Sequence, residues 1–159
     1  MLYNWKMSDP TRPARIGFLL TQLGTLAAEL FAAKTRELGI TPAEAGVLRI
    51  VGRQAGINQR ELAERLGLAP SRMVPLIDSL QASGLVIRSR SATDRRNQEL
   101  QLTEQGQELL ANLRAVAEEQ EAAIAEGLDP ADRAHLYELL LRLSAARGLD
   151  SDVHPGYRS

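Results

Sequence analysis

Two short segments interrupt a chain whose apolar residues otherwise recur at helical spacing, and they constrain the fold more than any other feature. Residues 85–90 are rich in β-forming side chains, and residues 98–102 alternate polar and apolar side chains with period two. The polar stretch 91–97 between them is typical of a turn, so the two segments predict a β-hairpin. A mainly α chain must therefore accommodate one small sheet.

Two short helices are predicted just before this hairpin. The first begins at Asn58, an N-cap residue with Glu61 three positions later, and the second spans residues 70–83. Two short helices joined by a turn form a helix-turn-helix, whose second helix can enter a major groove of DNA. A hairpin attached directly to it is a wing. Residues 41–103 are therefore predicted to be a winged helix-turn-helix lobe that binds DNA, with the wing at 85–102.

Long helical patterns occupy both ends of the chain. Residues 14–38 and 104–148 repeat apolar side chains at spacings of three and four. Because these stripes are wider than one small lobe can cover, a second copy is the simplest partner, and the pattern predicts a helical dimerisation lobe. An antiparallel helical hairpin within one chain is the alternative. Residues 1–13 and 149–159 lack periodicity and are interpreted as an N-terminal arm and a C-terminal tail. The predicted fold class is mainly α with a small β-hairpin wing.

Composition argues against several functional classes. The 159 residues include no cysteine and two histidines, His135 and His154, which excludes thiol chemistry and leaves few ligands for a metal. Because the sequence has neither a glycine-rich phosphate loop nor a Gly-x-Ser-x-Gly motif, we expect no enzyme activity, cofactor or metal site. No window approaches about 18 uninterrupted apolar residues, and residues 1–13 do not resemble a signal peptide. We therefore expect a cytoplasmic protein without a membrane partner.

The formal net charge of −1 argues against a polycationic nucleic-acid coat, but the charges are unevenly distributed. Residues 58–103 contain seven Lys or Arg and five Asp or Glu, whereas residues 104–150 contain four and ten. The hairpin alone carries four arginines against two acidic residues. The balanced total therefore combines a basic part suited to DNA phosphates with acidic C-terminal helices.

Several motifs occur together in one order. In this combination the chain resembles the MarR family of winged-helix transcriptional regulators over about residues 14–148. The resemblance implies a homodimer that binds double-stranded DNA at an inverted repeat with half-sites about one helical turn apart, and most members repress. In many members a small aromatic or anionic molecule in the crevice between the lobes releases the DNA; nothing in this sequence marks specific crevice residues. The motifs are QRELAERLG at 59–67, Ser71 to Leu80, Gly84-Leu85-Val86, Asp94-Arg95-Arg96 and Leu102-Thr103.

Ten residues are candidates for DNA contact. Arg72 projects from the first turns of the second short helix, where an arginine can bridge guanine O6 and N7; a solvated or phosphate-paired arginine is the alternative. Ser71 and Gln59 lie at helix starts and suit phosphate contacts, which simple capping explains nearly as well. The candidates are Gln59, Arg60, Ser71, Arg72, Pro75, Arg88, Arg90, Asp94, Arg95 and Arg96.

The resemblance assigns the tip of the wing to the minor groove. It implies that one arginine enters that groove, for which we favour Arg96, while Arg95 contacts phosphate and Asp94 pairs with an arginine to hold the tip. A tip of solvated charges is the alternative.

Pro75 departs from the family pattern, in which this position is usually polar or basic. Proline lacks an N–H and crowds the carbonyl of Ser71, so the helix is expected to bend unless it begins late, at Ser71 or Arg72. With Val74 and Pro75 toward the groove, the helix offers few hydrogen-bonding groups. We therefore expect modest base specificity at the helix and substantial specificity at the wing.

Two other functions fit the same pattern. One is a DNA-binding dimer that responds to no effector. The other is a winged-helix module that binds a protein and no DNA, which predicts binding without a steep dependence on salt.

Overall fold

The computed structural model describes residues 15–90 and 98–150 together with Val153 and Tyr157. Within these residues the chain is mainly α with a single β-hairpin, which confirms the predicted fold class. The elements are, in order, α1 (Ile16–Glu37), α2 (Pro42–Arg53), α3 (Gln59–Leu66), α4 (Pro70–Ala82), β1 (Val86–Arg90), β2 (Gln98–Leu102), α5 (Glu104–Ile124) and α6 (Pro130–Ala146).

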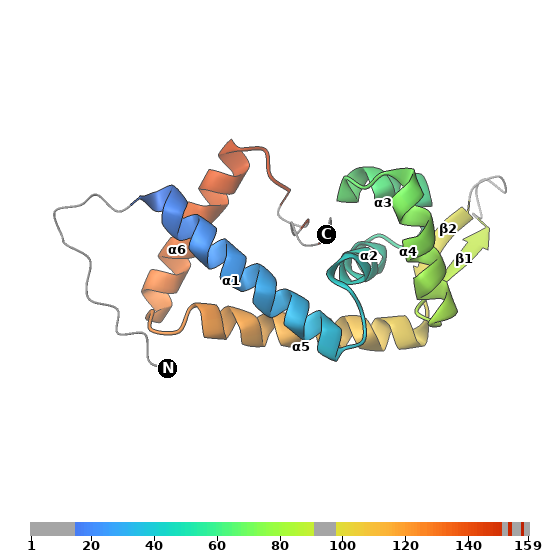
Figure 1. Ribbon diagram of the computed structural model, residues 1–159, viewed down its shortest axis with the longest axis horizontal. Helices are drawn as coiled ribbons and strands as arrows, with labels where there is room; N and C mark the ends of the chain where they lie inside the picture. The colour runs from blue at the N-terminus through green and yellow to red at the C-terminus, as the bar shows by residue number, and fades with distance from the viewer. Residues whose placement is uncertain (1–14, 91–97, 151–152, 154–156, 158–159) are drawn as a thin grey trace.

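The long helix α5 extends along much of the molecule (Figure 1). Helices α2, α3 and α4 gather with the hairpin around its first half, while α1 packs across it and α6 lies near its far end. One continuous helix therefore links the part that carries the hairpin to the part formed by the chain's first and last helices.

Local capping explains where the shorter helices begin. The Thr41 hydroxyl accepts from the Glu44 N–H at 3.2 Å, and the Glu44 carboxylate accepts from the Thr41 N–H at 2.8 Å. Asn58 and Glu61 form the same reciprocal pair at the start of α3, as the sequence predicts. Each pair satisfies two backbone N–H groups that lack a partner within the helix. Helix α3 ends at Gly67 in the left-handed conformation, with φ of 65°.

The hydrophobic core lies among α2, α3, α4 and the hairpin. Its members come from successive short elements, so no two of these helices can separate without exposing aliphatic surface. The largest fully buried side chains are Val47, Leu48, Ile50, Val51, Ile57, Leu62, Leu66, Met73, Ile77, Leu80, Val86 and Leu100.

A threonine joins the hairpin, the end of α4 and the start of α5. The hairpin is antiparallel and runs in register from Val86 opposite Leu102 to Arg90 opposite Gln98. Just beyond it, the Thr103 N–H donates to the Leu85 carbonyl at 3.1 Å, and the Thr103 hydroxyl donates to the Gly84 carbonyl at 2.6 Å. The same hydroxyl accepts from the Gly106 N–H at 3.0 Å and caps α5. The Gly-Leu-Val and Leu-Thr motifs therefore meet at one junction.

Helix α4 begins at Pro70, with Ala69 as its N-cap. Pro75 is therefore an interior residue, and the later start at Ser71 or Arg72 considered from the sequence is wrong. Because proline has no N–H, residue 75 cannot bond the Ser71 carbonyl, which remains available in the exposed first turns of the helix.

The first and last helices leave much apolar surface uncovered. In α1 the leucines at 19, 20, 23, 26 and 30 are exposed, and none of the 17 residues of α6 is buried. Within the described residues, α1 packs on α5 and makes no extensive contact with α6.

The apolar character of α1 bears on the expectation of no membrane partner. An 18-residue window within Ile16–Glu37 has a mean hydropathy of 1.5, so α1 is long and apolar enough to cross a membrane by length and composition. Thr21, Gln22 and Thr25 interrupt the run of apolar residues. They do not lower the mean hydropathy of the window below that of a possible membrane-spanning helix. Core helices of soluble proteins and signal sequences pass the same criterion, so the signal is weak.

The junction predicts a strong effect of a single methyl group at residue 106. A Cβ there would press against the carbonyl oxygen of Leu85. Despite the better helix propensity of alanine, Gly106→Ala should lower the free energy of unfolding by about 2 kcal/mol. Urea unfolding followed by circular dichroism measures this. The matched control is Gln107→Ala at the exposed neighbouring position, expected to change stability by less than about 0.5 kcal/mol. Equal effects of the two variants would show that the junction is not tightly packed.

Candidate DNA-binding surface

The first turns of α4 are exposed and uncapped by any side chain. Pro70 is the first helical residue, and the N-cap Ala69 offers no side-chain oxygen to the helix N–H groups. Ser71 is therefore not the cap, so capping does not account for it. Met73 is fully buried, whereas Ser71, Arg72, Val74 and Pro75 all face solvent. The exposed face combines one hydroxyl, one guanidinium and two apolar groups at the positive end of the helix dipole, which favours anions.

Arg88 joins the hairpin to both helices of the helix-turn-helix. Its Nη2 atom donates to Asp78 Oδ1 at 2.8 Å and to Gln59 Oε1 at 3.3 Å. The Arg88 side chain is only 26% exposed, whereas Asp78 is 55% exposed. Two of the predicted DNA contacts, Gln59 and Arg88, are thus bonded to each other and hold β1 against α3 and α4.

Asp78 was not among the predicted site residues. The signal for it lies in the sequence of α4, where Arg72 and Asp78 are the two charged residues. An isolated acid on a helix expected to face DNA would repel phosphates, and this conflict points to a cationic partner within the protein.

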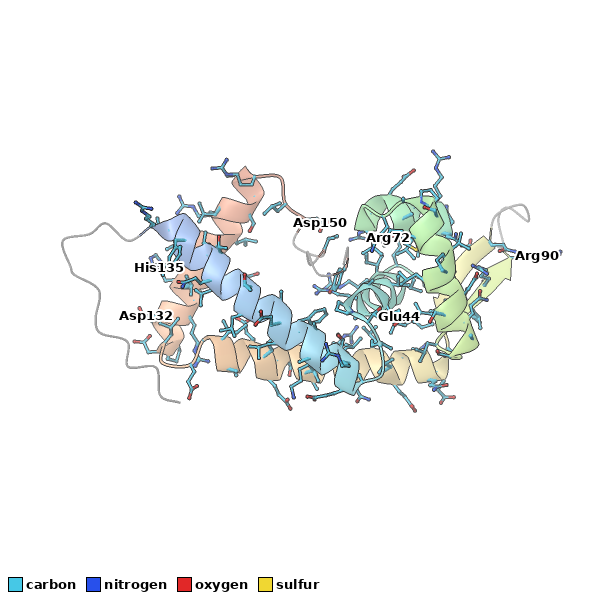
Figure 2. All side chains as sticks on the ribbon, in the orientation of Figure 1. Glu44, Arg72, Arg90, Asp132, His135 and Asp150 are labelled. Carbon is cyan, nitrogen blue, oxygen red and sulfur yellow. The ribbon has the colours of Figure 1, made fainter. Side chains whose placement is uncertain are left out.

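Two further candidates are exposed arginines. Arg90 is the last residue of β1 and lies at the outer end of the hairpin (Figure 2). Arg60, on the first turn of α3, donates through Nε to Glu64 at 3.0 Å, and its side chain is 89% exposed. Asp94, Arg95 and Arg96 lie outside the described residues, so their predicted roles at the wing tip stay predictions.

A cavity of about 330 Å³ lies where α1, α2 and α5 meet. It is lined by Arg49 and Arg53, which are one helical turn apart on α2, and by Arg114 of α5. Glu118 is the acidic residue in this lining, so the wall is cationic on balance. These arginines were not among the predicted site residues, although the spacing of four residues puts Arg49 and Arg53 on one face of α2.

The described residues contain no group of three or more His, Cys, Asp or Glu side chains able to hold a metal ion. His135 and Asp132 lie on α6 (Figure 2), far from the hairpin and from Asp150. His154 lies outside the described residues.

Comparison with known proteins finds similarity to transcriptional regulators of the MarR family. The profile of the MarR family matches residues 38–97. A protein of Thauera aromatica, named as a candidate transcriptional regulatory protein for the hcr operon, is 32% identical over 129 residues, which cover 80% of this chain and 78% of that protein. The crystal structure of CouR from Rhodococcus jostii RHA1 bound to p-coumaroyl-CoA has a TM-score of 0.70 and 30% identity, covering 84% of this chain and 92% of that one. The repressor CouR bound to a 23-mer DNA duplex has a TM-score of 0.69 and 31% identity, covering 81% and 92%.

The contact between Arg88 and Asp78 predicts a measurable coupling. A double-mutant cycle of Asp78→Asn and Arg88→Gln should give a coupling energy of about 1 kcal/mol, because the guanidinium is partly shielded from water and makes a second bond to Gln59. The matched control is the exposed pair Arg60 and Glu64, one turn apart on α3, for which about 0.3 kcal/mol is expected. Urea unfolding of the single and double variants gives both values. A coupling no larger than that of the control would contradict the role of Arg88 as the tie between hairpin and helices.

Proposed function

The chain belongs to the MarR family of transcriptional regulators, and from this premise we propose that it is a homodimeric repressor that binds an inverted repeat in double-stranded DNA. The observation that carries the proposal is the tie between α4 and the hairpin, in which Arg88 bonds Asp78 and Gln59 while Arg72 and Arg90 stay exposed. An exposed helix start held beside a projecting hairpin suits a major groove and the adjacent minor groove.

Base recognition in this proposal is divided unequally between helix and wing. Arg72 bonds a guanine edge or a phosphate, and Ser71 binds phosphate through its hydroxyl and its backbone N–H. Val74 and Pro75 are exposed and offer thymine methyl groups only apolar contact. Arg90 and Arg95 contact phosphates, and Arg96 enters the minor groove. Because Arg88 and Gln59 are engaged with each other, their part is chiefly to orient the wing.

Dimerisation follows from the uncovered apolar surface. A row of leucines on α1 and another on α6 are exposed in the single chain, at a cost in free energy of about 25 cal/mol for each Å² of apolar surface. A second copy related by a two-fold axis covers both rows and presents two copies of α4 to DNA, about one helical turn apart. The same pairing accounts for the hydropathy of α1 without a membrane, consistent with a cytoplasmic regulator.

A small effector is the proposed control. The neighbouring structures show CouR bound to DNA in one case and to p-coumaroyl-CoA in the other, which supports an aromatic and anionic effector here. In this chain the cationic cavity beside α1, α2 and α5 is the candidate seat. An effector that binds better to one spacing of the two DNA-binding lobes shifts the population toward that spacing and so releases DNA.

The proposal predicts a steep dependence of DNA binding on salt. In fluorescence anisotropy titrations against the gene's own upstream DNA, affinity should fall by orders of magnitude between about 50 and 200 mM salt. Arg96→Ala and Arg72→Ala should each weaken binding about tenfold or more, and each should reduce the salt slope by about 1. Arg133→Ala on α6 removes the same charge far from the hairpin and is the matched control.

Mismatched DNA sites separate the helix from the wing. If the wing supplies most specificity, Arg96→Ala should flatten the differences among sites, while Pro75→Ala should leave them largely intact. A change in base preference caused only by Pro75→Ala would contradict this division. Binding without a salt slope would favour a protein-interaction module instead.

Dimerisation has its own test by analytical ultracentrifugation. Leu23→Glu in α1 and Leu140→Glu in α6 should each convert a dimer into a monomer, because a charge would replace apolar surface at the interface. Ile87→Glu in β1 is the matched control, since Ile87 is exposed to a similar degree but lies outside both helices. A wild-type chain that sediments as a monomer would overturn the proposal.

A further inference from the structure

Tyr157, which follows the last helix α6 in the sequence, packs against α2. It is only 3% exposed and belongs to the main hydrophobic core. It also lines the cationic cavity beside α1, α2 and α5.

Three features of the cavity wall fit a phenol ring. A Cβ at residue 46 would lie 2.5 Å from Cγ of Tyr157, so the ring rests on α2 where only glycine leaves room. The ring of Phe31 is tilted by 59° with a centroid distance of 5.9 Å, within the range of favourable aromatic pairs. Arg49 Nη1 donates to the phenol oxygen of Tyr157 at 3.4 Å. The wall thus supplies an apolar floor, an aromatic edge and a cationic donor.

The rest of the cavity favours an anion. Arg53 and Arg114 line it together with Arg49, and Glu118 is the acidic residue in the lining. The cavity of about 330 Å³ is open space beside the Tyr157 ring, which forms part of its wall, so the seat of the ring and this space together can hold a small aromatic molecule that carries an acidic group. A molecule that carries a 4-hydroxyphenyl ring and a carboxylate therefore matches both parts, the seat of the ring and the arginines beside it.

We propose that the Tyr157 ring is a tethered ligand of the seat on Gly46 at the wall of this cavity, and that a free 4-hydroxyaryl anion binds by displacing the ring, with its anionic group in the open space beside the arginines. Because the ring is attached to the chain, its effective concentration at the seat is about millimolar or higher, and a free ligand must compete with it. Removal of the ring should therefore tighten binding of the free ligand. Only the consequence for DNA rests on the proposed function; occupation of the seat by Tyr157 does not.

Fluorine NMR of the full chain labelled with 3-fluorotyrosine tests the occupancy directly. The Tyr157 signal, assigned by its loss in Tyr157→Phe, should be displaced from the position of free fluorotyrosine in the wild type. In Gly46→Ala it should return to the free position, because the new methyl group collides with the ring. Gly17→Ala is the matched control, since a Cβ at this helical glycine of α1 meets nothing within 4 Å. A wild-type signal at the free position would overturn the proposal.

The probe for competition is 3-(4-hydroxyphenyl)propionate, which joins the side chain of tyrosine to a carboxylate. Its addition should move the Tyr157 signal to the free position, and 3-phenylpropionate, which lacks the hydroxyl, should need at least about tenfold more. By isothermal titration calorimetry the probe should bind Tyr157→Ala at least about tenfold more tightly than the wild type. Equal or weaker binding to Tyr157→Ala would overturn the proposal, since the ring would then be no competitor. An unmoved signal at saturating solubility of the probe would overturn it as well.

The outcome for DNA is separate. If the chain bound no DNA in anisotropy titrations while the fluorine signal moved as expected, the repressor function would fail and the tethered ligand would stand. If DNA bound normally and the signal did not move, the reverse would hold.

Discussion

The junction at Thr103 is the constraint on which the rest of the molecule depends. One threonine bonds the Gly84 and Leu85 carbonyls at the end of α4 and caps α5 through the Gly106 N–H. Because Gly106 has no side chain, α5 can lie directly against this corner. The hairpin, α4 and the long helix are therefore fixed to one another where the chain turns from DNA-facing elements to the terminal helices, and a movement of α5 must carry the hairpin with it.

Charge has two distinct uses on the DNA-facing side. The Arg88 guanidinium donates to Asp78 and Gln59, and these bonds hold β1 against both helices of the helix-turn-helix. Arg72 and Arg90 remain exposed and able to meet phosphates or bases. A count of arginines in the hairpin does not show which of them is bonded within the protein and which is exposed. The partner that distinguishes Arg88 is Asp78 on α4, ten positions away along the chain. Burial separates the two uses, since a partly shielded guanidinium requires a partner within the protein.

The fold was largely predictable because its signals are local. The capping pairs at Thr41 and Asn58 and the period-two alternation around the turn at 91–97 each depend on a few neighbouring residues. The site was only partly predictable. Arg72 on α4 and Arg90 at the end of β1 are exposed, as expected of residues that stay predicted DNA contacts, but the partner of Arg88 and the seat of Tyr157 on Gly46 depend on residues far apart in sequence. The hydropathy of α1 does not by itself identify what covers the helix, because apolar surface for a partner helix and for lipid have the same composition.

Helix α5 contacts the Thr103 junction, the cationic cavity and α1 in turn along its length. Its first turn is held at the Thr103 junction, the buried Leu110 and Leu113 follow, and Arg114 lines the cavity beside Tyr157. Further along, Gln120 donates to the Ala27 carbonyl of α1 at 2.8 Å. Whatever occupies the cavity therefore touches α1, α2 and α5 together, between the junction and the uncovered leucines. In the proposed function, a change of occupant alters the angle between the terminal helices and the hairpin without unfolding either, since a packed helix transmits displacement as a rigid body.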